Sequence, residues 1–120
     1  MLLVEMYVKG TKDKIHITRK AIKENLHSIR ATIGSAYGVE TRTVIIMPKF
    51  VSGTDVQAMS AGLPDIFFKI GNFGESVELP CADQLRDTLL RNCASMSTVS
   101  FKIGIVGRSD MYGNSTFRPN

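Results

Sequence analysis

The sequence has 120 residues, of which 43% are hydrophobic and 22% are charged, and its formal net charge is +4. This composition is that of a globular domain and excludes disordered, collagen-like and disulfide-rich chains. No apolar run approaches the roughly 20 residues of a membrane-spanning helix. We therefore expect one globular domain over residues 1–120 that makes no membrane contact.

The first half of the chain predicts two strands on either side of a helix. Alternating apolar residues over Leu2–Lys9 indicate a strand with one buried face. The helix should begin near Thr18, as its N-cap, and end at Gly34. A second strand over residues 39–47 should stop at Pro48 or lie at a sheet edge, because proline cannot donate a ladder hydrogen bond. Four residues at helical spacing form the expected apolar stripe: Ile22, Leu26, Ile29 and Ile33.

The middle of the chain carries turn signals. Thr54 and Gln57 have the spacing of a capping box, so residues 56–61 predict either a short helix or a long loop. Residues 65–71 and 75–79 flank a glycine-rich turn, which is typical of the two strands of a hairpin.

The last third predicts a second helix and a final strand. The helix should follow Pro80 and carry an ion pair between Asp87 and Arg91 on its outer surface. Residues 99–105 alternate as a buried strand, and a polar tail is expected from about Gly107. The expected core stripe of the second helix consists of Ala82, Leu85, Leu89, Cys93 and Met96.

These elements predict an α+β fold of order β-α-β-β-β-α-β. Two amphipathic helices would cover one face of a mainly antiparallel sheet, since each helix has one apolar stripe to bury. A ferredoxin-like topology with one added strand is the expected arrangement.

The two cysteines, Cys81 and Cys93, predict free thiols. If one helix carries both, they lie about 18 Å apart, which is too far for a disulfide. Free thiols are typical of a reducing compartment, so we expect a cytoplasmic protein.

Basic residues gather on one arc of the first helix. At about 100° per residue, five side chains fall within roughly a quarter-turn. This arc is either a phosphate-binding ridge or a solvated face that covers the edge of the core. The remaining face is small and neutral, and it is either exposed to solvent or packed across a homo-oligomer interface. The basic arc consists of Arg19, Lys20, Lys23, His27 and Arg30, and the neutral face of Ala21, Asn25, Ser28 and Thr32.

A second candidate site follows the last strand. The segment gathers a guanidinium, a hydroxyl, a carboxylate and a phenol, and loops held by rigid strands commonly bind ligands. Its alternative role is an ordinary turn that leads into a frayed tail. Phe73, at the tip of the expected hairpin, either stacks on a base or folds back onto the domain. The candidate ligand-binding side chains of the segment are Arg108, Ser109, Asp110 and Tyr112.

Motifs of catalysis and cofactor binding are absent from the sequence. It contains no phosphate loop, dinucleotide fingerprint or nucleophile elbow, and His16 and His27 form no metal-ligand pattern. We therefore expect no cofactor and no metal. The favoured hypothesis is a non-catalytic protein that binds a phosphate-bearing ligand, either nucleic acid or a small nucleotide. An assembly subunit that forms a homo-oligomer and a small enzyme of unknown class remain the alternatives.

Overall fold

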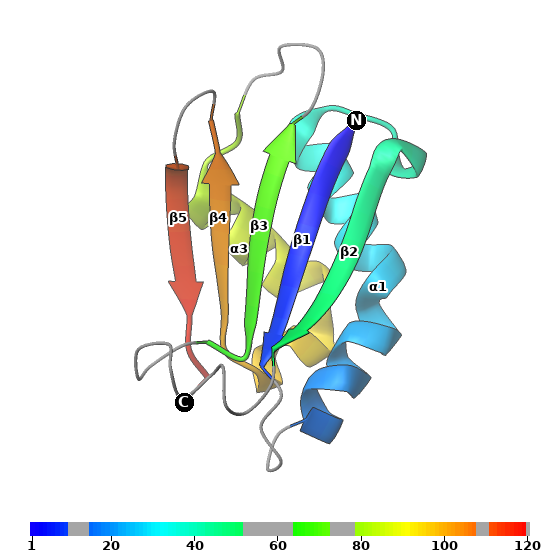
Figure 1. The fold of residues 1–120 in the computed structure, drawn as a ribbon, viewed down its shortest axis with the longest axis vertical. Coiled ribbons are helices and arrows are strands. Elements are labelled where there is room, and N and C mark those ends of the chain that lie inside the picture. The colour runs from blue at the N-terminus through cyan, green and yellow to red at the C-terminus, as the bar shows by residue number, and fades with distance from the viewer. Residues whose placement is uncertain (10–14, 52–63, 73–78, 108–110, 120) are drawn as a thin grey trace.

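A five-stranded sheet and a helix layer on one of its faces form the fold (Figure 1). The computed structural model describes residues 1–9, 15–51, 64–72, 79–107 and 111–119. The strands are β1 (Leu2–Lys9), β2 (Val44–Val51), β3 (Ile66–Asn72), β4 (Phe101–Val106) and β5 (Met111–Phe117). The helices are α1 (Ile15–Tyr37) and α3 (Ala82–Asn92), with short 3-10 helices η1 (Thr41–Thr43) and η2 (Ala94–Thr98). The expected α+β class, with two helices on one face, is confirmed.

The sheet is mixed, with the strand order β2-β1-β3-β4-β5. β1 pairs with β2, and β3 with β4, in parallel, whereas the β1–β3 and β4–β5 pairs are antiparallel. The sheet thus has fewer antiparallel pairs than expected. Helix α1 connects β1 to its neighbour β2, and α3 lies between β3 and its neighbour β4, and neighbouring strands joined through a helix run parallel. The two strands that each helix joins are direct neighbours, so the split arrangement of a ferredoxin-like sheet is not formed.

Two predictions for the second half of the chain, the hairpin and the polar tail, are wrong. β3 has no free edge for a hairpin partner, because β1 and β4 occupy both of its sides. Most of the expected partner, residues 75–79, lies outside the described residues, as do residues 56–61. The expected polar tail contains β5, which pairs with β4 and so forms a sheet edge. Pro48 lies in β2 at the other edge, as one of its two predicted placements requires.

Helix α1 runs further than expected at both ends. It begins at Ile15, so Thr18 lies inside the helix and is buried rather than capping it. It passes through Gly34 and ends where Gly38 adopts a φ of 70°. The amide of Gly38 donates to Ser35 O and that of Val39 to Gly34 O, which together form a Schellman motif. A side chain could not replace Gly34 easily, since an added Cβ would lie 3.2 Å from the oxygen of Val39.

The buried side of α1 is rotated from the expected apolar stripe. Ile29 and Ile33 are buried as predicted, but Leu26 is exposed. The face expected to be small, neutral and free for an oligomer interface instead packs inside the domain. Asn25 is 8% exposed and its amide donates to Ala21 O, while Asn92 of α3 donates to the hydroxyl of Thr32. These short side chains let α1 approach its neighbours closely, and hydrogen bonds within α1 and from α3 satisfy polar atoms of Asn25 and Thr32.

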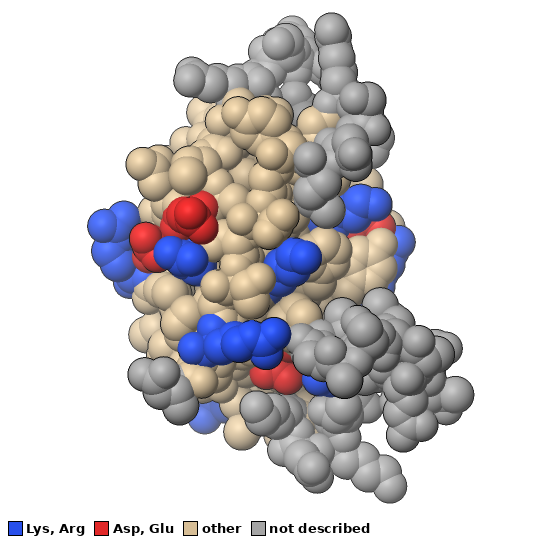
Figure 2. Space-filling model, turned by 90° about the vertical axis from the view of Figure 1, so that its left-hand side faces the viewer, with Lys and Arg blue, Asp and Glu red and all other residues tan. Residues whose placement is uncertain are grey.

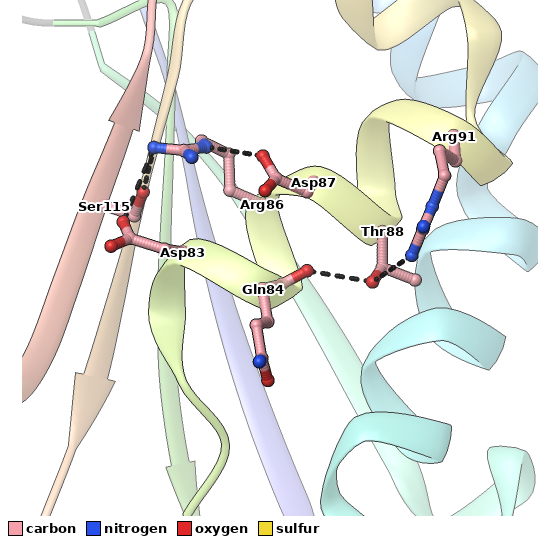
Figure 3. A network of polar contacts seen from close by, with 7 residues as sticks. All are labelled: Asp83, Gln84, Arg86, Asp87, Thr88, Arg91 and Ser115. Atoms are coloured by element: carbon pink, nitrogen blue, oxygen red, sulfur yellow. Dashed lines mark hydrogen bonds and ion pairs between the residues drawn. The ribbon is translucent and has the colours of Figure 1, made fainter.

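Helix α3 follows its predicted pattern on the inner side. All five residues of its expected core stripe, from Ala82 to Met96, are buried. The helix is shorter than expected, because α3 ends at Asn92, so Cys93 and Met96 follow it, Met96 within η2. The expected pair of Asp87 with Arg91 is not formed (Figure 3). Asp87 accepts instead from Arg86 at 3.0 Å, and Arg91 donates to Thr88. Arg86 also donates to Ser115 at 2.9 Å, which ties the outer surface of α3 to the edge strand β5. Among the described residues, no helix is both long and apolar enough to cross a membrane.

Candidate functional site

The sheet has one face that no described helix covers. The helix layer packs against the side chains of Leu2, Val4, Met6 and Val8 on β1, all of which are fully buried. Alternate residues of the five strands point to the other face, which is toward the viewer in Figure 1. We call this surface the open face. Strand register places on it Leu3, Glu5, Tyr7, Lys49, Phe67, Lys69, Lys102, Asn114 and Thr116, with Ile45 and Met47 at the β2 edge.

Two aromatic rings lie side by side at the centre of the open face, with a lysine at each end. Tyr7 on β1 is directly opposite Phe67 on β3, and their ring centroids are 6.0 Å apart. Lys49 of β2 pairs with Tyr7, and Lys102 of β4 pairs with Phe67. The Nζ atom of Lys49 lies 5.4 Å from the Tyr7 centroid, and that of Lys102 lies 5.8 Å from the Phe67 centroid. Four neighbouring strands thus contribute one row, which we call the aromatic row.

Glu5 holds one end of the aromatic row in place. Its Oε2 atom accepts from the Tyr7 hydroxyl at 2.7 Å and from Lys49 Nζ at 2.8 Å. These bonds, that of Lys49 first, hold the pKa of Glu5 below its usual value of 4.5, so the carboxylate is charged at neutral pH. The same contact raises the pKa of the Tyr7 hydroxyl. Glu5 and Lys49 therefore form a locally neutral pair that orients the tyrosine.

The other end of the aromatic row keeps its positive charge. Neither Lys69 nor Lys102 forms an ion pair with any residue that the structure describes. Lys69 follows Phe67 by two residues on β3 and so lies on the same face. On the side of the molecule formed by the β5 edge, Lys and Arg side chains are widely spread and acidic ones are few (Figure 2). The positive charge of the protein is therefore not confined to α1.

The predicted basic arc lies on the outer surface of α1, on the helix side of the sheet (Figure 1). Arg19 lies over the ring of Phe50, 5.0 Å from its centroid, and Lys20 pairs with Glu24 at 3.9 Å. Lys23 and His27 are exposed. Arg30 is half-buried, and its Nε atom has no hydrogen-bond partner within the described part of the chain. The arc and the open face are thus on opposite sides of the sheet.

Most of the second predicted site cannot be placed. Arg108, Ser109, Asp110 and Phe73 lie outside the described residues. Tyr112, which is 63% exposed, lines a hollow of about 470 Å³ together with Asp83 and the residues that precede α3. Tyr112 belongs to β5, at the sheet edge opposite β2, whereas α1 lies behind β1 and β2 (Figure 1). Of the second predicted site, the structure thus places only Tyr112, and it places it away from the basic arc.

A second cleft, of about 700 Å³, lies between the C-terminal half of α1 and the start of α3. Its lining side chains are neutral and include the exposed thiol of Cys81 at one end. Tyr37 is buried in its wall, and burial raises the pKa of the hydroxyl, which has no partner among the described residues. Both cysteines are free, with Cys93 in the core. A cleft without cationic side chains does not suit a phosphate.

The aromatic row is not predicted from the sequence, although its residues are visible there. Tyr7 and Lys102 alternate with the apolar residues of their strands, so each belongs to the solvent side of its strand. Aromatic and basic residues recur in this way on four strands, but alternation alone would place any polar residue there. Only the strand order shows that these residues meet, because it places Tyr7 beside Phe67, about 60 positions away in the sequence.

No protein-family model matches the chain, and no curated protein sequence is significantly similar to it. In the part of the chain that the structure describes, no three His, Cys, Asp or Glu side chains gather in the manner of a metal site.

Proposed function

We propose that the protein binds single-stranded nucleic acid, without catalysis, on the open face of its sheet. The observation that carries the proposal is the aromatic row, in which Tyr7 and Phe67 lie side by side between Lys49 and Lys102. Proteins that hold single strands combine aromatic rings, on which bases stack, with cations that contact the backbone. The row supplies both within one continuous surface.

The spacing of the rings suits two consecutive bases. Their centroids are 6.0 Å apart and the rings are inclined by 31°, so each ring can support its own base. Stacking contributes about 1–3 kcal/mol per base and does not depend strongly on base identity. Strands of a rigid sheet hold both rings, so little side-chain freedom is lost on binding.

The charges favour a polymer over a small nucleotide. Neither Lys69, which is opposite Glu5, nor Lys102 forms an ion pair with any described residue, and the two lie on different strands beside the same ring. Dispersed cations of this kind each neutralise one backbone phosphate. A small nucleotide would instead need an enclosed pocket with convergent polar groups, and the row lies on a sheet face.

The shape of the open face favours a single strand over a duplex. Bases in a duplex are stacked on one another and their faces are not accessible to side chains, whereas unpaired bases can be splayed onto a flat surface. A duplex could contact the lysines but not the rings. Stacking should therefore be lost and electrostatic attraction retained.

A titration at low salt tests the proposal. Labelled single strands of DNA and RNA, a duplex of the same length and a mononucleotide are each mixed with the protein, and binding is followed by fluorescence anisotropy. We expect the single strands to bind most tightly, with affinity that falls as salt is raised. Tighter binding of the duplex, or no binding of any polymer at low salt, would show that the proposal is wrong.

A further inference from the structure

Glu5 is an unexpected residue in a surface that attracts phosphate. It lies two residues before Tyr7 on β1 and directly opposite Lys69 on β3, so it borders the aromatic row. Its side chain is 21% exposed. A carboxylate beside the rings repels a passing phosphate, and it must therefore either weaken binding or serve another purpose there.

The two carboxylate oxygens of Glu5 have different surroundings. Oε2 accepts both internal hydrogen bonds, from Tyr7 and from Lys49. No donor reaches Oε1 from any of the described residues. The Lys49 ammonium balances the charge of Glu5, and the Lys69 ammonium on the opposite strand acts in the same direction. Glu5 therefore presents one free acceptor next to the Tyr7 ring rather than an isolated negative charge.

We infer that Oε1 of Glu5 accepts a hydrogen bond from the exocyclic amino group of the base that stacks on Tyr7, so that the open face favours cytosine over uracil or thymine at that position. The inference rests on the proposed function, which supplies the stacked base. In single strands the Watson–Crick edges of the bases are free to be read. Carboxylates accept from the N4 amino group of cytosine, whereas uracil and thymine present the O4 oxygen at the same place.

The physical basis of the preference is a difference between attraction and repulsion. With cytosine, N4 donates to a charged acceptor, and such bonds are stronger than neutral ones. With uracil, the O4 oxygen faces the carboxylate without a proton between them, and both are desolvated. Cytosine and uracil stack similarly and differ mainly at this edge, so the pair isolates the contribution of Glu5.

The test compares oligo(dC) with oligo(dU) of equal length on the full chain, slightly above neutral pH. We expect the wild type to bind oligo(dC) about tenfold more tightly. Glu5→Gln keeps the shape of the side chain but adds an amide that can donate to O4, so the ratio should fall to about twofold or less. Circular dichroism of the variant shows whether its fold is retained.

Glu24→Gln on α1 is the matched control, since it removes the same charge on the helix side of the sheet. It should leave the ratio of the two affinities unchanged. If the wild type binds both oligomers equally, or if Glu5→Gln strengthens both by the same factor, Glu5 acts only through its charge and the inference is wrong. If neither oligomer binds the wild type, it is the proposed function that fails.

Discussion

The open face and the outer surface of α1 both carry several basic residues, but their surroundings differ. On α1, Arg19 covers the ring of Phe50 and Lys20 pairs with Glu24. On the open face, the rings of Tyr7 and Phe67 lie side by side, and each has a lysine over it. The lysine over Phe67, Lys102, forms no ion pair with any residue that the structure describes. The number of positive charges on a surface is thus a weaker guide to binding than the groups that lie beside them.

The basic residues of α1 are easier to group from the sequence than those of the open face. Basic residues on a helix recur at short intervals and can be assigned to one arc from the sequence alone. Those of the open face come from β2, β3 and β4 and are collected only by the strand order. Basic residues that are dispersed in the sequence can therefore form a better-defined binding surface than residues that recur along one helix.

The largest expected effect comes from removing the rings. Replacing both Tyr7 and Phe67 by Ala should weaken single-strand binding by roughly 2–6 kcal/mol, since each stacked base contributes about 1–3 kcal/mol. The matched control is Phe50→Ala, which removes an exposed ring on the helix side of the sheet and should leave affinity unchanged. Fluorescence anisotropy measures all three proteins. If Phe50→Ala weakens binding as much as the double replacement does, the rings of the open face have no special role in binding.

A second experiment tests which side of α1 is buried. Ala21 is 1% exposed, so Ala21→Leu should overpack the contact between α1 and its neighbours and lower the free energy of unfolding by about 1–3 kcal/mol. Lys23→Leu, two residues away on the outer surface, should change it by less than about 0.5 kcal/mol. Urea denaturation measures both. If Lys23→Leu lowers the free energy of unfolding more than Ala21→Leu does, α1 buries the side that carries Lys23 instead.

Salt dependence separates the two sets of lysines. Replacing Lys69 and Lys102 by Gln should reduce the slope of log affinity against log salt by about 0.7 for each lost contact, as expected for single strands. For each contact this is about a threefold change in affinity between 50 and 200 mM salt. The same replacement of Lys20 and Lys23 on α1 preserves the net charge change and should leave the slope as it is. If the replacements on α1 reduce the slope and those on the open face do not, the predicted basic arc is the binding surface.

The smallest expected effect is on stability in acid. Because its contacts lower the pKa of Glu5 below 4.5, the charged carboxylate stabilises the fold above that pH and loses this contribution as pH falls through the lowered pKa. Between neutral pH and about pH 3, the wild type should lose more stability than Glu5→Gln. The difference should be less than about 1 kcal/mol, since the carboxylate is partly exposed to solvent. Parallel losses in the two proteins would mean that the contacts of Glu5 contribute nothing.

Sequence patterns predicted the elements with one simple periodicity. The alternation of β1 is confirmed, and so is the burial of the stripe that begins in α3, although Cys93 and Met96 lie beyond the end of the helix. Helix α1 was assigned correctly but turned wrongly, because Thr18, Asn25 and Thr32 are polar by composition and buried in the fold. Asn25 donates to Ala21 O one turn earlier, and Thr32 accepts from Asn92 of α3, and no scale of average hydrophobicity represents such partners.

The missed strand and the missed row share a cause. β5 has the sequence Met-Tyr-Gly-Asn-Ser-Thr-Phe, in which glycine and asparagine disfavour a strand, and it becomes one only because the edge of β4 is open to it. In the same way, Tyr7 and Phe67 meet only because β1 lies beside β3. β4 and β5 are consecutive strands, whereas Tyr7 and Phe67 are about 60 positions apart, but both cases depend on strand pairing, which the propensity of a single segment does not encode.

The central place of β1 constrains how the chain acquires its structure during synthesis. β1 is made before its two neighbours, and its second edge stays uncovered until the ribosome has passed from Lys9 to Ile66 and beyond. At roughly 5–20 residues per second this interval lasts several seconds. During that time, any unit formed by β1, α1 and β2 leaves one edge of β1 open to other chains. Slowing translation before β3 should therefore promote misassembly more than slowing it after β4.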